Sequence, residues 1–170
     1  MKKYISSFVC GFGAGVLQVV PIAKSLSCCL IMPAAVFLAL ILDRKSKKMT
    51  CILETKTAVM IGLFTGLYAA LFGTFFDLFI TFITKNNDLI VLFPQLQEMI
   101  SEIVSDTELA DQVIAIYAKV IEDIQLYGFS DMYALSVFLS NFIINLIFSL
   151  IGALIGVQII NSKMGGKISG

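Results

Sequence analysis

Four apolar stretches dominate this 170-residue chain, and each is as long, or nearly as long, as a helix that crosses a lipid bilayer. A hydrocarbon core of about 30 Å takes roughly 20 helical residues to cross. The stretches cover residues 4–22, 26–42, 57–84 and 133–160. Only 14% of the residues are charged and the mean hydropathy is +0.94, whereas soluble domains are about a quarter charged. The sequence therefore predicts an all-α, polytopic membrane protein, with about four transmembrane helices in a single domain of residues 1–170.

The positions of the charged residues predict which ends of these helices face the cytoplasm. Cytoplasmic loops of membrane proteins carry an excess of Lys and Arg. Nine of the twelve basic residues fall at the two termini or in the segment 43–56, whereas the segment 85–132 holds nine acidic residues and two lysines. We therefore expect a multi-pass protein of the inner (plasma) membrane with both termini in the cytoplasm.

The acidic segment between the third and fourth apolar stretches carries a helical pattern of its own. Apolar residues recur at helical spacing from Pro94 to Val104, and Ser105 and Glu108 then match a capping box that opens a second helix. Residues 88–127 are therefore expected to form an amphipathic hairpin outside the membrane. Its polar face is acidic, which disfavours anionic lipid. The apolar face is expected to pack on the outer end of the helix bundle or to bind a protein partner.

One acidic residue, Asp77, lies inside a predicted span, where a charge is costly and marks a candidate functional site. Asn141 is expected at a similar depth in the fourth span, with Asn145 one turn deeper. Gln18, near the outer end of the first span, completes a candidate intramembrane polar cluster. The long side chain of Lys24, in the turn after the first span, is expected to extend toward Asp77. Two interpretations stay open: a proton or cation site, or hydrogen bonds that link helices.

Glycines spaced four residues apart indicate faces where helices approach each other closely. Small residues at this spacing flatten one side of a helix, so that a second backbone can contact it. The pairs are Gly11 and Gly15 in the first span, Gly62 and Gly66 in the third, and Gly152 and Gly156 in the fourth. They favour packing between helices of one chain, with a homodimer as the alternative.

The sequence carries no recognisable catalytic or metal site. Histidine is absent, which removes the most common general base and metal ligand near neutral pH. The nucleophile motif GxSxG is also absent. The formal net charge is +0, so nucleic-acid binding has no electrostatic basis. We expect no metal, no cofactor and no enzymatic activity.

Three functional hypotheses follow from the residues alone, and a membrane enzyme that acts on lipid ranks last because acid–base candidates are few. The first is a non-catalytic scaffold or subunit of a membrane assembly, surrounded by lipid, which contacts a protein partner through the outer hairpin. The alternative is a small transporter or channel component that uses Asp77. The sequence names neither a partner nor a substrate.

The first half of the chain also resembles a set of small bacterial membrane proteins of unknown function. The resemblance rests on Gly11-x-Gly13-x-Gly15, Val20-Pro21-Ile22 and Cys28-Cys29-Leu30, followed by the basic segment and the Gly62 and Gly66 helix. Those proteins have an N-terminal helical hairpin with a proline turn and a Cys-Cys pair, then two further helices. The similarity covers about residues 8–75 and implies a four-helix membrane protein. Met32-Pro33-Ala34 stands where that set more often has glycines, and no catalytic residue is transferred.

Overall fold

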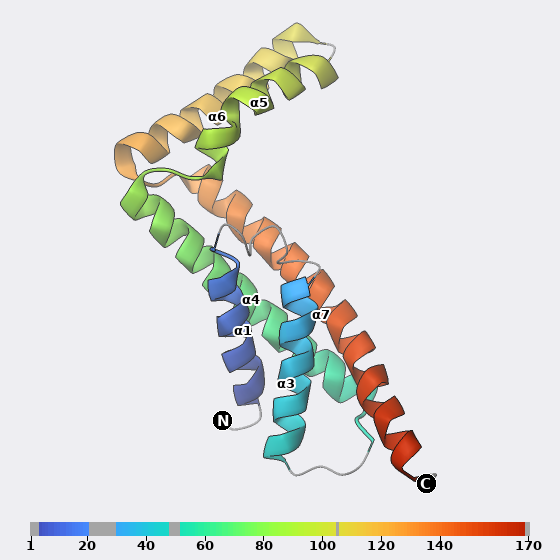
Figure 1. Ribbon diagram of the computed structural model, residues 1–170. Coiled ribbons are helices and arrows are strands. Elements are labelled where there is room, and N and C mark those ends of the chain that lie inside the picture. The colour runs from blue at the N-terminus through green and yellow to red at the C-terminus, as the bar shows by residue number, and fades with distance from the viewer. Residues whose placement is uncertain (1–3, 21–29, 48–51, 105, 169–170) are drawn as a thin grey trace. The chain divides into compact units, whose positions relative to one another are not determined.

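The computed structural model describes residues 4–20, 30–47, 52–104 and 106–168, and every regular element in these ranges is a helix. The all-α prediction is therefore confirmed. The helices are α1 (Ile5–Leu17), α3 (Met32–Ser46), α4 (Thr55–Thr84), α5 (Asp88–Ile103), α6 (Thr107–Tyr127) and α7 (Asp131–Ile168) (Figure 1). They fall into two compact units, which we call the bundle unit (residues 1–76 and 138–170) and the hairpin unit (residues 77–137).

Two helical segments, Thr55–Thr84 and Asp131–Ser162, are long and apolar enough to cross a membrane. They correspond to the third and fourth predicted spans. The described helices of the first two spans are shorter, because α1 has 13 residues and α3 has 15. At about 1.5 Å per residue, neither reaches across a core of about 30 Å. The remainder of those two spans, with Lys24 and the Cys28–Cys29 pair, lies outside the described residues.

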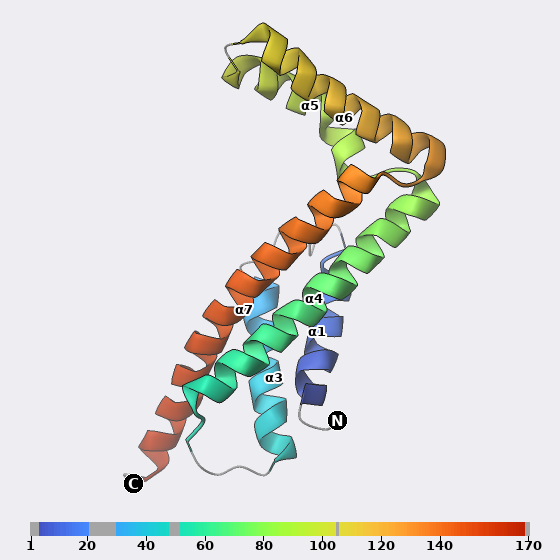
Figure 2. The same cartoon turned by 180° about the vertical axis from the view of Figure 1, so that it is seen from behind.

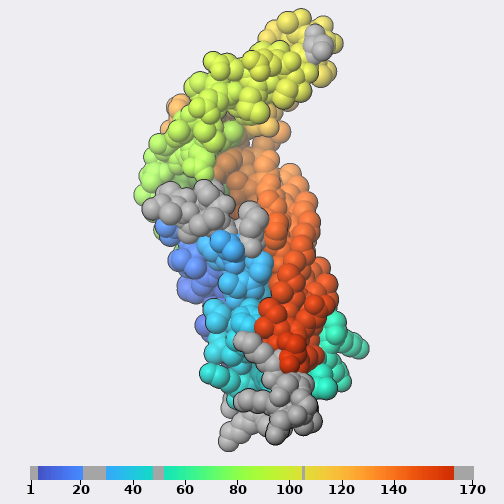
Figure 3. All heavy atoms as spheres, turned by 45° about the vertical axis from the view of Figure 1, so that its right-hand side comes forward, coloured from blue at the N-terminus to red at the C-terminus, as the bar shows by residue number. Residues whose placement is uncertain are grey.

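In the bundle unit, α1 and α3 pack together on one side of the α4–α7 pair (Figure 1, Figure 2). Successive helices alternate in direction, so the end of α3, the beginning of α4 and the end of α7 lie at one end of the unit. The side chains of α3 and α7 meet closely along their shared face (Figure 3). One apolar cluster of the interior joins α3, α4 and α7, and includes Val36, Leu40, Ile61 and Val157.

A reciprocal pair of hydrogen bonds joins the segment before α4 to the last turns of α7. The backbone N–H of Leu53 donates to Asn161 Oδ1 (2.9 Å), and Asn161 Nδ2 donates back to the Leu53 carbonyl (3.0 Å). Leu53 is buried, so without this side chain its backbone groups would lack a partner at low solvent access. Asn161 thereby holds the segment before α4 against the last turns of α7.

In the hairpin unit, α5 and α6 pack against each other and lie within the hairpin expected over residues 88–127. The first helix starts earlier than the expected Pro94, because the side chain of Asn87 caps the chain at residue 88. Asn87 Oδ1 accepts a hydrogen bond from the N–H of Ile90 (3.0 Å), which satisfies a donor of the first turn. Pro94 lies inside α5 instead.

The ends of α6 are held by two residues with suitable backbone geometry. Asp106 is the N-cap, and its carboxylate accepts a hydrogen bond from the N–H of Glu108 (3.0 Å). The capping box proposed at Ser105 falls on a residue outside the described ranges, and the cap lies one position later. Gly128 ends the helix with φ at 77°, and its N–H donates to the Ile124 carbonyl (2.8 Å). Glycine adopts this left-handed conformation without steric cost.

Candidate functional site

Three residues of the expected polar cluster come together inside the bundle unit. Gln18 Nε2 donates to Asn145 Oδ1 (2.5 Å), and Asn145 Nδ2 donates back to Gln18 Oε1 (3.2 Å). Asn145 Nδ2 also donates to the carbonyl of Asn141 (2.8 Å), one turn earlier on α7. The side chain of Asn141 donates to Thr74 Oγ1 on α4 (3.1 Å). The hydrogen bonds therefore connect α7 with α4 and with the residue that follows α1.

Two glycines of α4 lie against the two residues that form the amide pair. A Cβ atom at Gly73 would lie 2.8 Å from Gln18 Oε1, and one at Gly66 would lie 2.9 Å from the Asn145 carbonyl oxygen. At Gly66 the close atom belongs to the backbone of α7 and cannot give way, whereas at Gly73 it is the end of the flexible Gln18 side chain. The backbone of α4 thus lies against the Gln18 amide at Gly73 and against the backbone of α7 at Gly66, and Asn145 and Thr74 are buried.

The chemistry of the cluster is that of neutral hydrogen-bonding groups. A carboxamide is both donor and acceptor, and it has no proton to exchange near neutral pH. Each amide of the Gln18–Asn145 pair uses both its nitrogen and its oxygen on the other. The arrangement can link helices, with about 0.6 to 2 kcal/mol expected for each hydrogen bond in a membrane.

Asp77, the fourth residue of the expected cluster, lies in the part of α4 that belongs to the hairpin unit. Its side chain is half-buried. The residue expected beside it, Asn141, uses its side-chain amide on Thr74, and Lys24 lies outside the described ranges. The structure therefore brings the three amides together in one unit and places Asp77 in the other.

All six glycines expected at helix contacts lie where two helices of the bundle unit approach each other. A Cβ atom at any of them would lie under 3.0 Å from an atom of another helix. Gly11 and Gly15 face α4, Gly62 and Gly66 face α7, and Gly152 and Gly156 face α3. Each glycine pair is therefore occupied by a neighbouring helix of the same chain.

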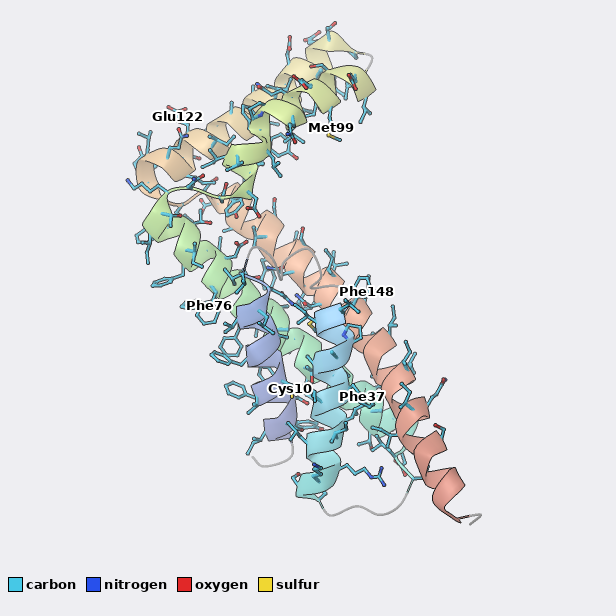
Figure 4. All side chains as sticks on the ribbon, in the orientation of Figure 1. Cys10, Phe37, Phe76, Met99, Glu122 and Phe148 are labelled. Carbon is cyan, nitrogen blue, oxygen red and sulfur yellow. The ribbon has the colours of Figure 1, made fainter. Side chains whose placement is uncertain are left out.

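A row of aromatic rings between α1 and α4 was not predicted from the sequence. Phe8 and Phe12 of α1 alternate with Tyr68, Phe72 and Phe76 of α4, and neighbouring rings have centroids 5.0–6.1 Å apart in edge-to-face geometry. Phe76 and the rings around it are visible in Figure 4. The signal was present, because aromatic residues recur every fourth position on both helices, which places them on one face.

Replacement of Asn145 by leucine is expected to lower the free energy of unfolding by about 1–3 kcal/mol, because the Gln18 amide loses its partner inside the bundle. Thermal unfolding in detergent micelles measures this effect. The double replacement Gln18→Leu and Asn145→Leu removes both polar groups and should recover part of the loss. Gln158→Leu, at an exposed position of the same helix, is the matched control. An equal loss in Gln158→Leu would contradict a specific role for the amide pair.

Within the described ranges, no three His, Cys, Asp or Glu side chains are grouped in a way that could hold a metal ion. Comparisons of the chain with protein-family models, with curated proteins and with solved structures found no match. The function is therefore inferred from the residues and contacts of the chain itself.

Proposed function

We propose that this chain is a four-span protein of the inner (plasma) membrane, with both termini in the cytoplasm. In this proposal it acts as a non-catalytic scaffold or subunit, in which the bundle unit is the membrane anchor and the hairpin unit contacts a partner protein on the outer side. The chain thereby belongs to the same class as the small four-helix bacterial membrane proteins that its first half resembles.

The observation that carries the proposal is the outer surface of the bundle unit, which is lined by large apolar side chains although the interior also holds apolar residues. On α7, Asn145 and Ser149 are buried, whereas Ile147 is 51% exposed. The other exposed residues of that helix include Ile143, Ile144, Ile151, Leu154, Ile155 and Ile159. On α4, Thr65 is fully buried and Phe75 is 59% exposed. Large apolar residues over the outer surface, with polar side chains such as Asn145 turned inward, are typical of helices solvated by lipid.

The positive charges at one end of the bundle unit support the orientation. Arg44 and Lys45 lie in the last turn of α3, and Lys56 lies in the first turn of α4. These helix ends lie together, at the end of the bundle unit where α7 also finishes. Cytoplasmic ends of membrane helices carry such an excess of Lys and Arg, which favours this end as the cytoplasmic one.

The contacts inside the bundle unit favour a structural role over transport. The amides of Gln18 and Asn145 are paired with each other, and Asn141 is paired with Thr74. A transport site would need polar groups directed toward a solute, whereas these groups are directed toward neighbouring helices. The alternative of a transporter or channel component therefore rests on Asp77 alone.

The orientation predicts which introduced cysteines react with a membrane-impermeant maleimide in intact cells. In a background with all four native cysteines replaced by serine, Glu122→Cys in α6 should be labelled from outside. Lys45→Cys at the end of α3 should be labelled only after the membrane is opened, and both positions are exposed. The reverse pattern would overturn the orientation. Release of the chain by alkaline carbonate, or a soluble monomer without detergent, would overturn the membrane assignment.

The scaffold role is tested by the mass of the native assembly. The chain has a mass of 18.6 kDa. After extraction from its own membrane in mild detergent, light scattering corrected for the bound detergent should give a protein mass larger than that of one chain. Mass spectrometry of the same fraction should show a second protein in constant ratio. A protein mass equal to one chain, with no second component after cross-linking in the membrane, would contradict the role.

A further inference from the structure

The two helices of the hairpin unit leave a large part of their apolar surface exposed. None of the residues Asp88–Ile103 of α5 is buried, although α5 packs against α6. In α6 the buried residues are Ala110, Val120, Ile121 and Ile124. Each helix of a pair buries only the stripe that faces the other helix, so apolar residues beyond that stripe stay exposed. A third element is needed to cover the remainder.

The exposed apolar residues of the two helices form one surface, which we call the hairpin face. It consists of Leu92, Met99 and Ile103 of α5 with Leu109 and Ile116 of α6, all about half exposed or more. Spacings of seven and four residues place the members from each helix on one side of that helix. Viewed along its own axis, each helix has its row rotated in the same sense away from the interface that the two helices share. Because the helices are antiparallel, the two rows therefore lie on the same side of the hairpin.

Acidic residues border this apolar surface. Asp88 lies four residues before Leu92, and Glu102 lies three residues after Met99, so each carboxylate is beside an apolar member of the hairpin face. Both acids are exposed. Over residues 88–127 the chain has eight acidic residues and one lysine, Lys119. The hairpin face is therefore an apolar strip within a strongly negative surrounding.

This charge pattern distinguishes among the partners that could cover the strip. A second copy of the hairpin would bring two negative borders together, and like charges across an interface disfavour association. An anionic lipid surface is disfavoured for the same reason, because helices that bind such surfaces are basic. A helix with apolar residues on one side and Lys or Arg at its flanks matches both the strip and its border.

We propose that the hairpin face binds a basic-flanked amphipathic helix of a partner protein, which completes a three-helix arrangement with α5 and α6. This inference rests on the proposed function, since it specifies the chemistry of the partner that the scaffold holds. The apolar side of the partner helix covers Leu92, Met99 and Ile103. Its basic flanks face Asp88 and Glu102, which orient the helix and accelerate its association.

The proposal is tested with a defined peptide and the full chain in nanodiscs of zwitterionic lipid. The probe is a fluorescent helical peptide of about three heptads, with leucine on one side and lysine at the flanking positions. A second peptide has glutamate in place of each lysine. Fluorescence anisotropy should show binding of the basic peptide, with the acidic peptide at least about tenfold weaker at low salt. The difference should decrease as added salt screens the charges.

Variants of the chain measure separately how much the apolar strip and the surrounding negative charge contribute to binding of the peptide. Met99→Gln combined with Ile103→Gln should weaken the basic peptide by about tenfold or more, as expected for central interface residues. Glu102→Lys should weaken it several-fold. The matched control is Glu122→Lys, which makes the same charge change on α6 away from the hairpin face (Figure 4) and should have a smaller effect than Glu102→Lys. Circular dichroism verifies that each variant keeps its helix content.

Several results would overturn the inference. These are equal binding of the two peptides, unchanged binding in the double glutamine variant, or equal effects of Glu102→Lys and Glu122→Lys. A dimer that is lost on Met99→Gln would identify a second copy as the occupant. Protection of residues 92–103 from hydrogen exchange only in anionic nanodiscs would identify lipid as the occupant.

The outcome is distinguishable from that of the proposed function. If the native assembly contains a second protein but the peptide does not bind, the scaffold role is supported and the basic-helix partner is contradicted. Peptide binding that depends on Met99 and Glu102 supports the docking inference even if cysteine labelling places the hairpin in the cytoplasm, which would overturn only the orientation.

Discussion

Leucine in place of Gly11 is expected to destabilise the bundle unit by about 3 kcal/mol, near the upper end of the usual cost of overpacking. A Cβ atom at this position would lie 2.7 Å from both the Thr65 carbonyl oxygen and Tyr68 Cβ, and 3.3 Å from the backbone nitrogen of Ala69. Two of these three atoms belong to the backbone of α4, so they cannot yield unless the whole helix moves. The added side chain therefore separates α1 from α4.

The same replacement two residues later provides the control. Gly13 lies on the same helix, and among the described residues no atom that a Cβ would meet lies within 4 Å of it. Gly13→Leu should leave stability unchanged or raise it slightly, since leucine favours a helix over glycine by up to about 1 kcal/mol. Unfolding in mixed micelles with increasing SDS compares the two variants. Equal destabilisation would show that α1 does not contact α4 through Gly11.

Alanine at Gly128 is expected to destabilise the hairpin unit by about 2–4 kcal/mol. Two costs add here: about 1–2 kcal/mol for a left-handed conformation with a side chain, and a clash of the new Cβ, which would lie 2.7 Å from the Phe82 carbonyl oxygen. The value of φ is 77°. Hydrogen exchange of the α6 amides should accelerate, because the cap that ends this helix is lost.

A second variant separates these two costs. Asparagine tolerates the left-handed region better than alanine does, but its Cβ meets the same carbonyl oxygen. Gly128→Asn should therefore recover only the conformational part of the loss. Gln125→Ala, at an exposed position of α6, serves as the matched control. Exchange rates in Gly128→Ala equal to those in Gln125→Ala would contradict the assigned contact with Phe82.

The features that the sequence predicts well are those with a short repeat. Apolar runs and helical periodicity predicted the all-α fold and placed helices close to the observed α4 and α7. Pairs such as Gly62 and Gly66 indicate a flattened helix face directly, because the two residues are one turn apart. In each case the signal lies within a single element, so one sequence is enough to detect it.

Features that depend on distant partners were not predicted. Gly73 carries no signal by itself, and its contact with the Gln18 side chain joins residues that are far apart in sequence. Asn161 lies at the end of an apolar stretch, where its link to Leu53 across 108 residues cannot be inferred from spacing. A local error is different in kind: the observed cap of α6 is Asp106 and not the expected Ser105, since neighbouring residues with similar capping propensity compete within one turn.

The partner of the Gln18 side chain lies 127 residues further along the chain, in the last helix. A ribosome adds roughly 5–20 residues per second, so a newly made α1 waits on the order of ten seconds before Asn145 is synthesised. During that interval its amide has no Asn145 to bind, and in the proposed membrane protein it would rely on water at the bilayer surface or on the insertion machinery. The bundle can therefore be completed only after α7 has been synthesised. A chain truncated before residue 145 should be recognised as incompletely folded and degraded.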